Sequence, residues 1–282
     1  DGGGWTTQVI LVNPTDSAIS GTVRFLGPGS SRATAQAANL ILTDAQVGSE
    51  FSYSIPPRSS KRLQTSNPGG ATQVGSVRVV RDSWSSSPSG VAVFSLINSN
   101  VTVSEAGVPA QTAGTIFRVY VEASGTSGAI GSVRSGVAIT NTSSTATTVT
   151  FELTDLTGTS TGQTGSLVVP ALGQIAKFVD EIFPSLTTPF SGVLRVTSNS
   201  AKVAIVGLRG RTNQRSDFLI TTTPPTDEGG VATSTEFLFP HLVDGGGWST
   251  QIVLFSGISG QTANGMMRFF ASSGEPVKLT FQ

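Results

Sequence analysis

Residues 9–26, VILVNPTDSAISGTVRFL, contain two runs in which apolar and polar residues alternate, separated by the stretch NPTDS. Alternation with a period of two is typical of a β-strand with one buried face, because successive side chains point to opposite sides. Asn, Pro, Asp and Ser favour tight turns. The stretch therefore predicts two strands joined by a turn.

The same pattern recurs through the first part of the chain. It predicts strands at residues 6–13, 20–27, 37–43, 50–55, 59–65, 74–81, 90–98 and 102–108. Seven or eight short strands in about a hundred residues, with turns rich in Gly, Pro and Ser, indicate an all-β, immunoglobulin-like (Ig-like) β-sandwich. Helical spacing is found at 175–183, IAKFVDEIF, which ends before Pro184 and predicts one or two helical turns.

The chain also repeats itself. DGGGWTTQ at 1–8 returns as DGGGWSTQ at 244–251. The segment 137–153, VAITNTSSTATTVTFEL, resembles 9–26: Asn141 falls on Asn13, and a two-residue gap in the turn places Phe151 on Phe25. Self-similarity of this kind is the signature of a tandem array.

Two further pairs of matching segments indicate where the repeated units begin and end. GSVRVV at 75–80 matches GVLRVT at 192–197, and FRVYVEASG at 117–125 corresponds to FLFPHLVDG at 237–245. We therefore expect tandem sandwich units with partial units at the chain ends. Their predicted bounds are 1–111 for a unit that lacks its leading strand, 112–229 for a complete unit, and 230–282 for a partial, strand-donating unit.

Composition narrows the classes of function. The chain has 17 Lys and Arg against 17 Asp and Glu, and only 12% of its residues are charged. A nucleic-acid partner needs an excess of cations, so none is expected. No apolar run reaches about 18 residues, so no membrane insertion is expected. Cysteine is absent, which removes disulfides and thiol chemistry. Few charges and many hydroxyl groups fit a secreted, extracellular or cell-surface protein whose signal peptide is not in this chain.

Catalytic residues are hard to find. His241 is the one histidine, and its counterpart in the repeat is Val121, which favours a packing role over catalysis. The neighbouring acids Glu152 and Asp155 have no acidic counterparts in the first repeat, so surface charge is the preferred reading. We expect no enzyme activity, no cofactor and no metal. Asp1 and Asp244 could bind calcium, but a turn-forming role is preferred because no other acids accompany them.

Several side chains remain as candidate sites. Asn100 in NVT and Asn141 in NTS match the acceptor pattern for N-glycosylation. Trp5 and Trp248 follow three glycines each and are expected to anchor loops, with each indole covering one end of a sandwich core. The alternative for both is an exposed aromatic that stacks on carbohydrate. Phe237 and Phe239 are candidate assembly anchors. Trp84, in the loop RDSWSSSPSG, is the aromatic best suited to stack on a carbohydrate.

The sequence resembles tandem repeats in large secreted bacterial proteins. The resemblance covers nearly the whole chain and is strongest for 165–282. It is carried by these stretches: QIAKFVDEIFPSL at 174–186, FSGVLRV at 190–196, VGLRGRTNQRSDFLITTTPP at 206–225 and FLFPHLVDGGGWSTQIVLF at 237–255. It implies a β-repeat of the bacterial surface.

These observations predict a non-enzymatic extracellular structural protein. Copies of the chain would assemble head-to-tail into a fibre or filament by strand complementation, because a sandwich that lacks a strand exposes a sheet edge and part of its core. Two alternative functions are an adhesin or carbohydrate-binding module with glycans as partners, and the accessory domains of a secreted hydrolase whose catalytic part lies elsewhere. The alternative explanation for the partial units is that the missing strands lie outside these 282 residues.

Overall fold

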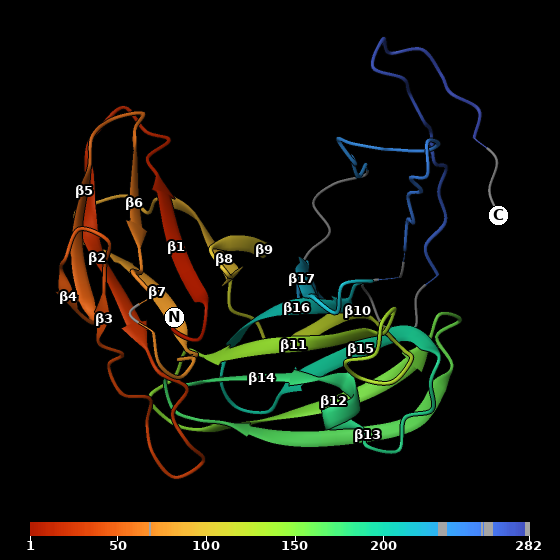
Figure 1. Ribbon diagram of the computed structural model, residues 1–282, viewed down its shortest axis with the longest axis horizontal. Coiled ribbons are helices and arrows are strands. Elements are labelled where there is room, and N and C mark those ends of the chain that lie inside the picture. The colour runs from red at the N-terminus through yellow and green to blue at the C-terminus, as the bar shows by residue number, and fades with distance from the viewer. Residues whose placement is uncertain (68, 231–235, 255, 257–261, 280–282) are drawn as a thin grey trace. The chain divides into compact units, whose positions relative to one another are not determined.

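The computed structural model describes the whole chain except residues 68, 231–235, 255, 257–261 and 280–282 (Figure 1). The chain forms two compact units, Asp1–Thr233 and Ser234–Gln282. The first unit consists of antiparallel sheets, which confirms the predicted all-β class. It contains two separate hydrophobic cores, formed by residues between Val9 and Leu63 and by residues between Phe117 and Ile205.

The first core lies between two sheets. One has the strand order β6-β1-β8-β9 and the other β5-β2-β7. Apolar residues at alternate positions meet in the middle, including Leu11 of β1, Val23 of β2 and Phe51 of β5. The strands are β1 (Trp5–Val12), β2 (Ile19–Leu26), β5 (Glu50–Ile55), β6 (Ser60–Gln64), β7 (Ser76–Arg81), β8 (Ser89–Asn98) and β9 (Val101–Pro109).

The second core has a comparable frame with two additional strands, β10 and β18. Its sheet has the order β13-β12-β15-β10-β11-β16-β17, with β14 paired to β11 and β18 paired to β10. Phe151, Leu194 and Ile139 are fully or almost fully buried in it. The strands are β10 (Ile116–Ser124), β11 (Val133–Asn141), β12 (Thr147–Asp155), β13 (Ser160–Val169), β14 (Gln174–Phe178), β15 (Phe190–Ser198), β16 (Val203–Thr212), β17 (Phe218–Thr223) and β18 (Thr226–Asp227).

Two predicted elements differ from the structure. The helix expected at 175–183 is a single turn, α1 (Val179–Ile182), because Ile175 and its neighbours pair with β11 as strand β14. The strand expected at 37–43 is reduced to β3 (Leu40–Ile41), which pairs with a short strand that the sequence did not reveal, β4 (Val47–Gly48).

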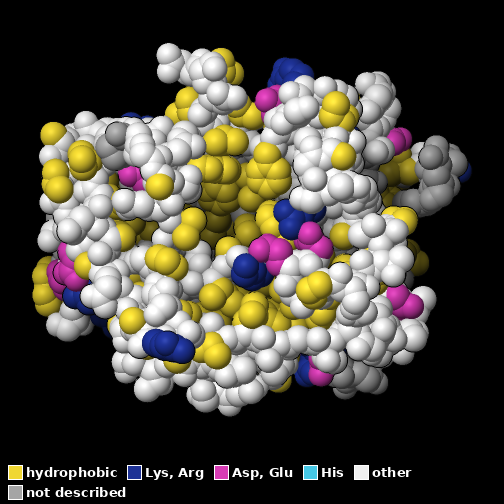
Figure 2. Space-filling model, turned by 60° about the horizontal axis from the view of Figure 1, so that its bottom comes forward, with side chains coloured by type: hydrophobic (Ala, Val, Ile, Leu, Met, Phe, Trp, Pro, Cys, Tyr) yellow, Lys and Arg dark blue, Asp and Glu magenta, His cyan; other side chains and the backbone are white. Residues whose placement is uncertain are grey.

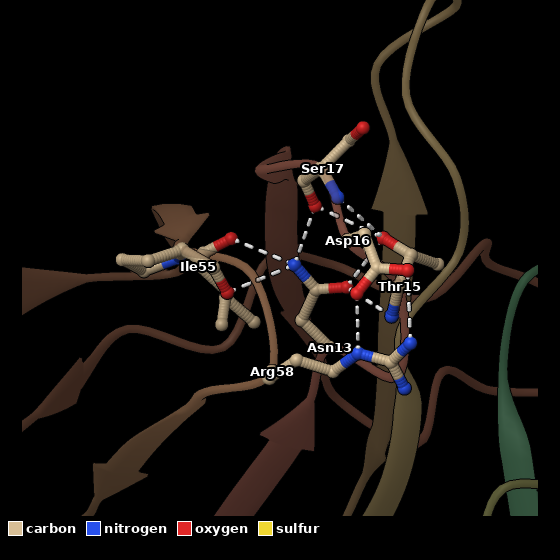
Figure 3. A network of polar contacts seen from close by, with 7 residues as sticks. Asn13, Thr15, Asp16, Ser17, Ile55 and Arg58 are labelled. Atoms are coloured by element: carbon tan, nitrogen blue, oxygen red, sulfur yellow. Dashed lines mark hydrogen bonds and ion pairs between the residues drawn. The ribbon is translucent and has the colours of Figure 1, made fainter.

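A buried asparagine closes the first turn of each core. The Nδ2 of Asn13 donates hydrogen bonds to the carbonyls of Ser17, Ile55 and Pro56 at 2.8, 3.1 and 2.9 Å (Figure 3). Its Oδ1 accepts a hydrogen bond from the backbone N–H of Thr15, at 2.9 Å. Each asparagine thus ties a turn between two strands to the end of a third strand.

Asn141 occupies the same position in the second core. Its Nδ2 donates to the carbonyls of Thr145, Val169 and Pro170 at 2.7, 3.3 and 3.1 Å. Asn13 is 1% exposed and Asn141 0% exposed, so these hydrogen bonds replace water that neither group can reach.

The matching turns correct the sequence alignment between the repeats. Each asparagine bonds the carbonyl four residues further on, so the two turns have equal length and no gap is needed. Val23, not Phe25, therefore occupies the place of Phe151. The ladders agree, since Val23 pairs with Val79 as Phe151 pairs with Val196.

The second unit contains no strand among its described residues. Many of its large apolar side chains are exposed, led by Phe237 and Leu238 at 79% and Met266 at 78%. A segment this rich in exposed apolar side chains is typical of a surface that meets a partner.

We expect Asn141→Ala to lower the free energy of unfolding by about 3 kcal/mol, because the buried carbonyls of Val169 and Pro170 lose their donor and the turn loses its bond to Thr145. Urea denaturation followed by far-ultraviolet circular dichroism measures this. Asn199→Ala is the control: Asn199 is exposed, and the change is expected to stay within about 0.5 kcal/mol. An equal effect of the two substitutions would contradict the role assigned to Asn141.

Candidate functional site: the open edge of strand β7

Strand β7 is paired on one side only. It pairs with β2 from Gly21↔Arg81 to Leu26↔Ser76, and within the described part of the chain no strand pairs with its other edge. The corresponding strand β15 is paired on both sides, with β12 and with β10. The first core therefore has an open position where the second core holds β10.

The backbone of β7 presents hydrogen-bonding groups to this open position. Asp82 donates its N–H to the carbonyl of Ser20 beside β2, at 3.0 Å. Because N–H groups alternate in direction along an antiparallel strand, those of Val77, Val79 and Arg81 face away from β2. At the matching place beside β15, Ser198 donates its N–H to the carbonyl of Thr115, which precedes β10, at 2.7 Å.

Side chains on β7 are less buried than their counterparts on β15. Val79 is 39% exposed, whereas its counterpart Val196 is 0% exposed and lies across from Phe117 of β10. Val77 is half-buried, whereas its counterpart Leu194 is 0% exposed. The open position of the first core is thus both an unpaired backbone edge and an uncovered part of the apolar interior.

One glycine at each site shows that the neighbouring ladders have the same geometry. A Cβ on Gly75 would lie 2.1 Å from the carbonyl oxygen of Leu26, and a Cβ on Gly192 would lie 2.1 Å from that of Thr154. Real Cβ atoms do not approach oxygen so closely, so both positions require glycine. The first core keeps the close strand approach of the second core up to its open edge.

The two DGGGW motifs form the same turn. The glycines have φ values of 82°, 59° and 88° at Gly2–Gly4, and 90°, 61° and 87° at Gly245–Gly247. Three successive positive φ angles explain the run of glycines. Trp5 is half-buried with its ring 5.7 Å from that of Phe94, whereas Trp248 is 71% exposed.

The other predicted aromatic and glycosylation residues are scattered. Trp84 is 77% exposed in the loop after β7, while Phe237 and Phe239 are 79% and 61% exposed in the second unit. Asn100 is exposed in the turn between β8 and β9. Asn141 is buried and its amide nitrogen is fully engaged, so glycosylation there requires an unfolded turn. Within the first unit, Trp84, Asn100 and Asn141 therefore lie on different elements.

On the face shown in Figure 2, charged side chains lie in small groups of mixed sign. Glu152 pairs with Arg195, Asp180 with Arg134 and Glu181 with Lys177. His241 is exposed. Among the described residues no group of three or more His, Cys, Asp and Glu side chains could hold a metal ion. A cavity of about 150 Å³, beside Asp44 and Arg62, is smaller than the roughly 300 Å³ at which ligand pockets usually begin.

Arg209 of β16 and Asn213, directly after β16, have structural partners. Arg209 forms an ion pair with Glu122 of β10. The Oδ1 of Asn213 accepts hydrogen bonds from the backbone N–H groups of Arg215 and Asp217, both at 2.9 Å. These contacts hold β16 to its neighbours.

Glu228, directly after β18, is the most buried of the paired acids. Its side chain is 7% exposed and forms ion pairs with Arg118 of β10 and Arg195 of β15. Burial alone would raise the pKa of Glu228, but hydrogen bonds from Arg195 and Arg118 outweigh it, and the pKa is lower than that of a free glutamate. The sequence did not single out this residue, because its partners lie 110 and 33 positions away.

Amide hydrogen exchange should distinguish the two edges. We expect the amides of Val77, Val79 and Arg81 to exchange much faster than those of Leu194, Val196 and Ser198, because only the second set has a partner strand. Mass spectrometry or NMR of the unassembled chain measures the protection. Equal protection at both edges would show that β7 is covered.

A pH series should reveal the role of Glu228. A lowered folded-state pKa means that the ionised side chain stabilises the fold above the unfolded value of about 4.5 and loses this effect as the pH falls through the folded value. We expect Glu228→Gln to cost about 1–3 kcal/mol at pH 7 in urea denaturation, with the difference narrowing in acid. The control is Glu50→Gln, whose exposed ion pair with Arg24 should contribute less than about 1 kcal/mol.

None of the described helices is long and apolar enough to cross a membrane. Comparison with models of known protein families, with curated protein sequences and with solved structures finds no match to this chain.

Proposed function

We propose that this chain is a non-enzymatic extracellular structural protein, built from tandem Ig-like β-sandwich units, whose copies assemble head-to-tail into a fibre or filament at a cell surface. The observation that carries the proposal is the open edge of β7 beside an incompletely covered core. The same position beside β15 is filled by β10.

Strand addition is the interaction that this edge favours. A strand entering the position would receive backbone hydrogen bonds along β7 and would cover Val77 and Val79. The main chain supplies affinity, and the apolar side chains at alternate positions supply specificity. If the entering strand belongs to another copy, each copy offers a different surface to each neighbour, and such contacts propagate into filaments unless they close into rings.

The proposal that the protein is non-enzymatic rests on the interactions that the acidic side chains form. Four of those that could serve as general acids or bases, Glu122, Glu152, Asp180 and Glu228, form ion pairs with arginines. Asp155 accepts hydrogen bonds within its own turn, from Thr157 and Thr159. The extracellular setting rests on the low charge, the absence of cysteine and the resemblance to secreted bacterial repeats.

The acceptor edge can be tested by one substitution. We expect Val79→Lys to abolish filaments, because a lysine at an open edge opposes pairing with an apolar strand. Val47→Lys is the matched control, since Val47 is 70% exposed on β4, away from the edge. Electron microscopy and sedimentation at rising protein concentration compare the variants with the unaltered chain.

Circular dichroism should show that both variants keep their sheets. Single dispersed particles of the unaltered chain at every concentration would contradict the proposal. Filaments that survive Val79→Lys unchanged would place the joint elsewhere. In the first case a glycan-binding role through the exposed Trp84 becomes the better proposal.

A further inference from the structure

We infer that residues 237–241 of a second copy occupy the open position beside Gly75 and β7, in one specific register that stops before Gln73, whose backbone is hydrogen-bonded to Asp1. This inference rests on the proposed assembly and adds the identity of the donated strand. It begins from the correspondence between FLFPHLVDG at 237–245 and FRVYVEASG at 117–125, which contains most of β10.

Side chains of the segment match those of β10 on the buried face. In β10 the buried residues alternate: Phe117, Val119, Val121 and Ala123 are between 0% and 4% exposed. The corresponding residues of the segment are Phe237, Phe239, His241 and Val243. Three of these four are apolar, and the two phenylalanines are exposed in the single chain. The segment therefore has the pattern of a strand with one buried face.

Pro240 is compatible with this role because of its place in the alternation. Pro240 corresponds to Tyr120. The carbonyl of Thr115 accepts a hydrogen bond from β15, whereas the N–H of Glu122 bonds the Oγ of Ser135, on the other side. The backbone N–H and C=O groups of even-numbered residues of β10 thus point away from β15. Pro240, at an even-numbered position, lacks only a donor that would point away from β7, which is where an edge strand tolerates proline.

The ladder between β10 and β15 determines the register. Phe117 pairs with Val196, Arg118 with Arg195 and Val119 with Leu194. Transferred to the first core, Phe237 lies across from Val79, Leu238 across from Arg78, and Phe239 across from Val77. His241 then lies across from Gly75, as Val121 lies across from Gly192.

We assign the strand to a second copy because strand and edge each expose apolar side chains. Val79 is 39% exposed, and Phe237 and Phe239 are 79% and 61% exposed. One strand and one edge from neighbouring copies would cover all three side chains. Each copy contains both parts, so the contact can repeat along a filament.

Cysteine cross-linking tests the register directly, since the chain contains no cysteine of its own. Arg78 and Leu238 would form a pair without mutual hydrogen bonds, in which Cα atoms lie about 4.5 Å apart, a separation that suits a disulfide. We mix Arg78→Cys chains with Leu238→Cys chains in glutathione buffer. We expect a disulfide-linked dimer, with the joined peptides identified by mass spectrometry.

The control mixture replaces Arg78→Cys by Val80→Cys, which lies on the same face of β7 two residues further on. Diagonal positions are about 7–8 Å apart, so we expect at least about tenfold less cross-linked product. A chain carrying both Arg78→Cys and Leu238→Cys should form a ladder of covalent multimers. A single cross-linked chain in place of that ladder would overturn donation by a second copy.

The outcomes separate this inference from the proposed function. Filaments that are sensitive to Val79→Lys but lack the link between residues 78 and 238, or that prefer position 80, would overturn the donor or its register and leave the assembly intact. The absence of any filament would overturn both. Dimers linked only through residue 238 on both chains would also count against the register.

Discussion

Every β-strand has two hydrogen-bonding edges, and the structure depends on how the edge beyond β7 and β15 is satisfied. Around the second core, β10 pairs with β15 and is itself covered in part by β18. Glu228, directly after β18, then joins β10 and β15 through two arginines. Around the first core the row of groups beyond β7 has no such partner among the described residues. An unpaired edge beside an apolar interior is the kind of surface that recruits another strand.

The two cores differ at this edge although their strands and turns are built in the same way. A buried asparagine satisfies three carbonyls in each core, and a glycine permits the same close strand approach beside Leu26 and beside Thr154. Both devices deal with backbone groups that lie away from water, where a missing partner costs about 1–3 kcal/mol. The shared devices explain why β7 keeps the geometry of β15 although no strand of the described residues pairs with its other edge. They also explain why Asn141, which matches an acceptor pattern in the sequence, has no free amide nitrogen.

A role in assembly accounts for features that a binding or catalytic protein would not need. Charged side chains are few. Glu122, Glu152, Asp180 and Glu228 form ion pairs with arginines, and Asp155 accepts hydrogen bonds within its own turn. Exposed apolar residues occur along the whole chain, and they include Val79 and Val80 on the edge and Phe237, Leu238 and Phe239 in the second unit. Edge and segment have complementary requirements: one lacks a strand, and the other has the pattern of a strand without a sheet. In this interpretation the informative surfaces are joints between copies.

The sequence alone determined the positions of strands and turns, which depend on interactions between neighbouring residues. Alternation located most strands to within a few residues, and the repeated DGGGW formed the same glycine turn twice, because φ preferences and side-chain direction act over a few neighbouring residues. The correspondence of 117–125 with 237–245 was visible as well. Tertiary structure decided the rest. The helix at 175–183 shrank to one turn because β11 competes for Ile175, and Glu228 gained its arginines across 110 and 33 positions. Whether β7 or β15 is open depends on a partner strand far away in sequence, and alternation records which face of a strand is buried but not which of its edges is paired.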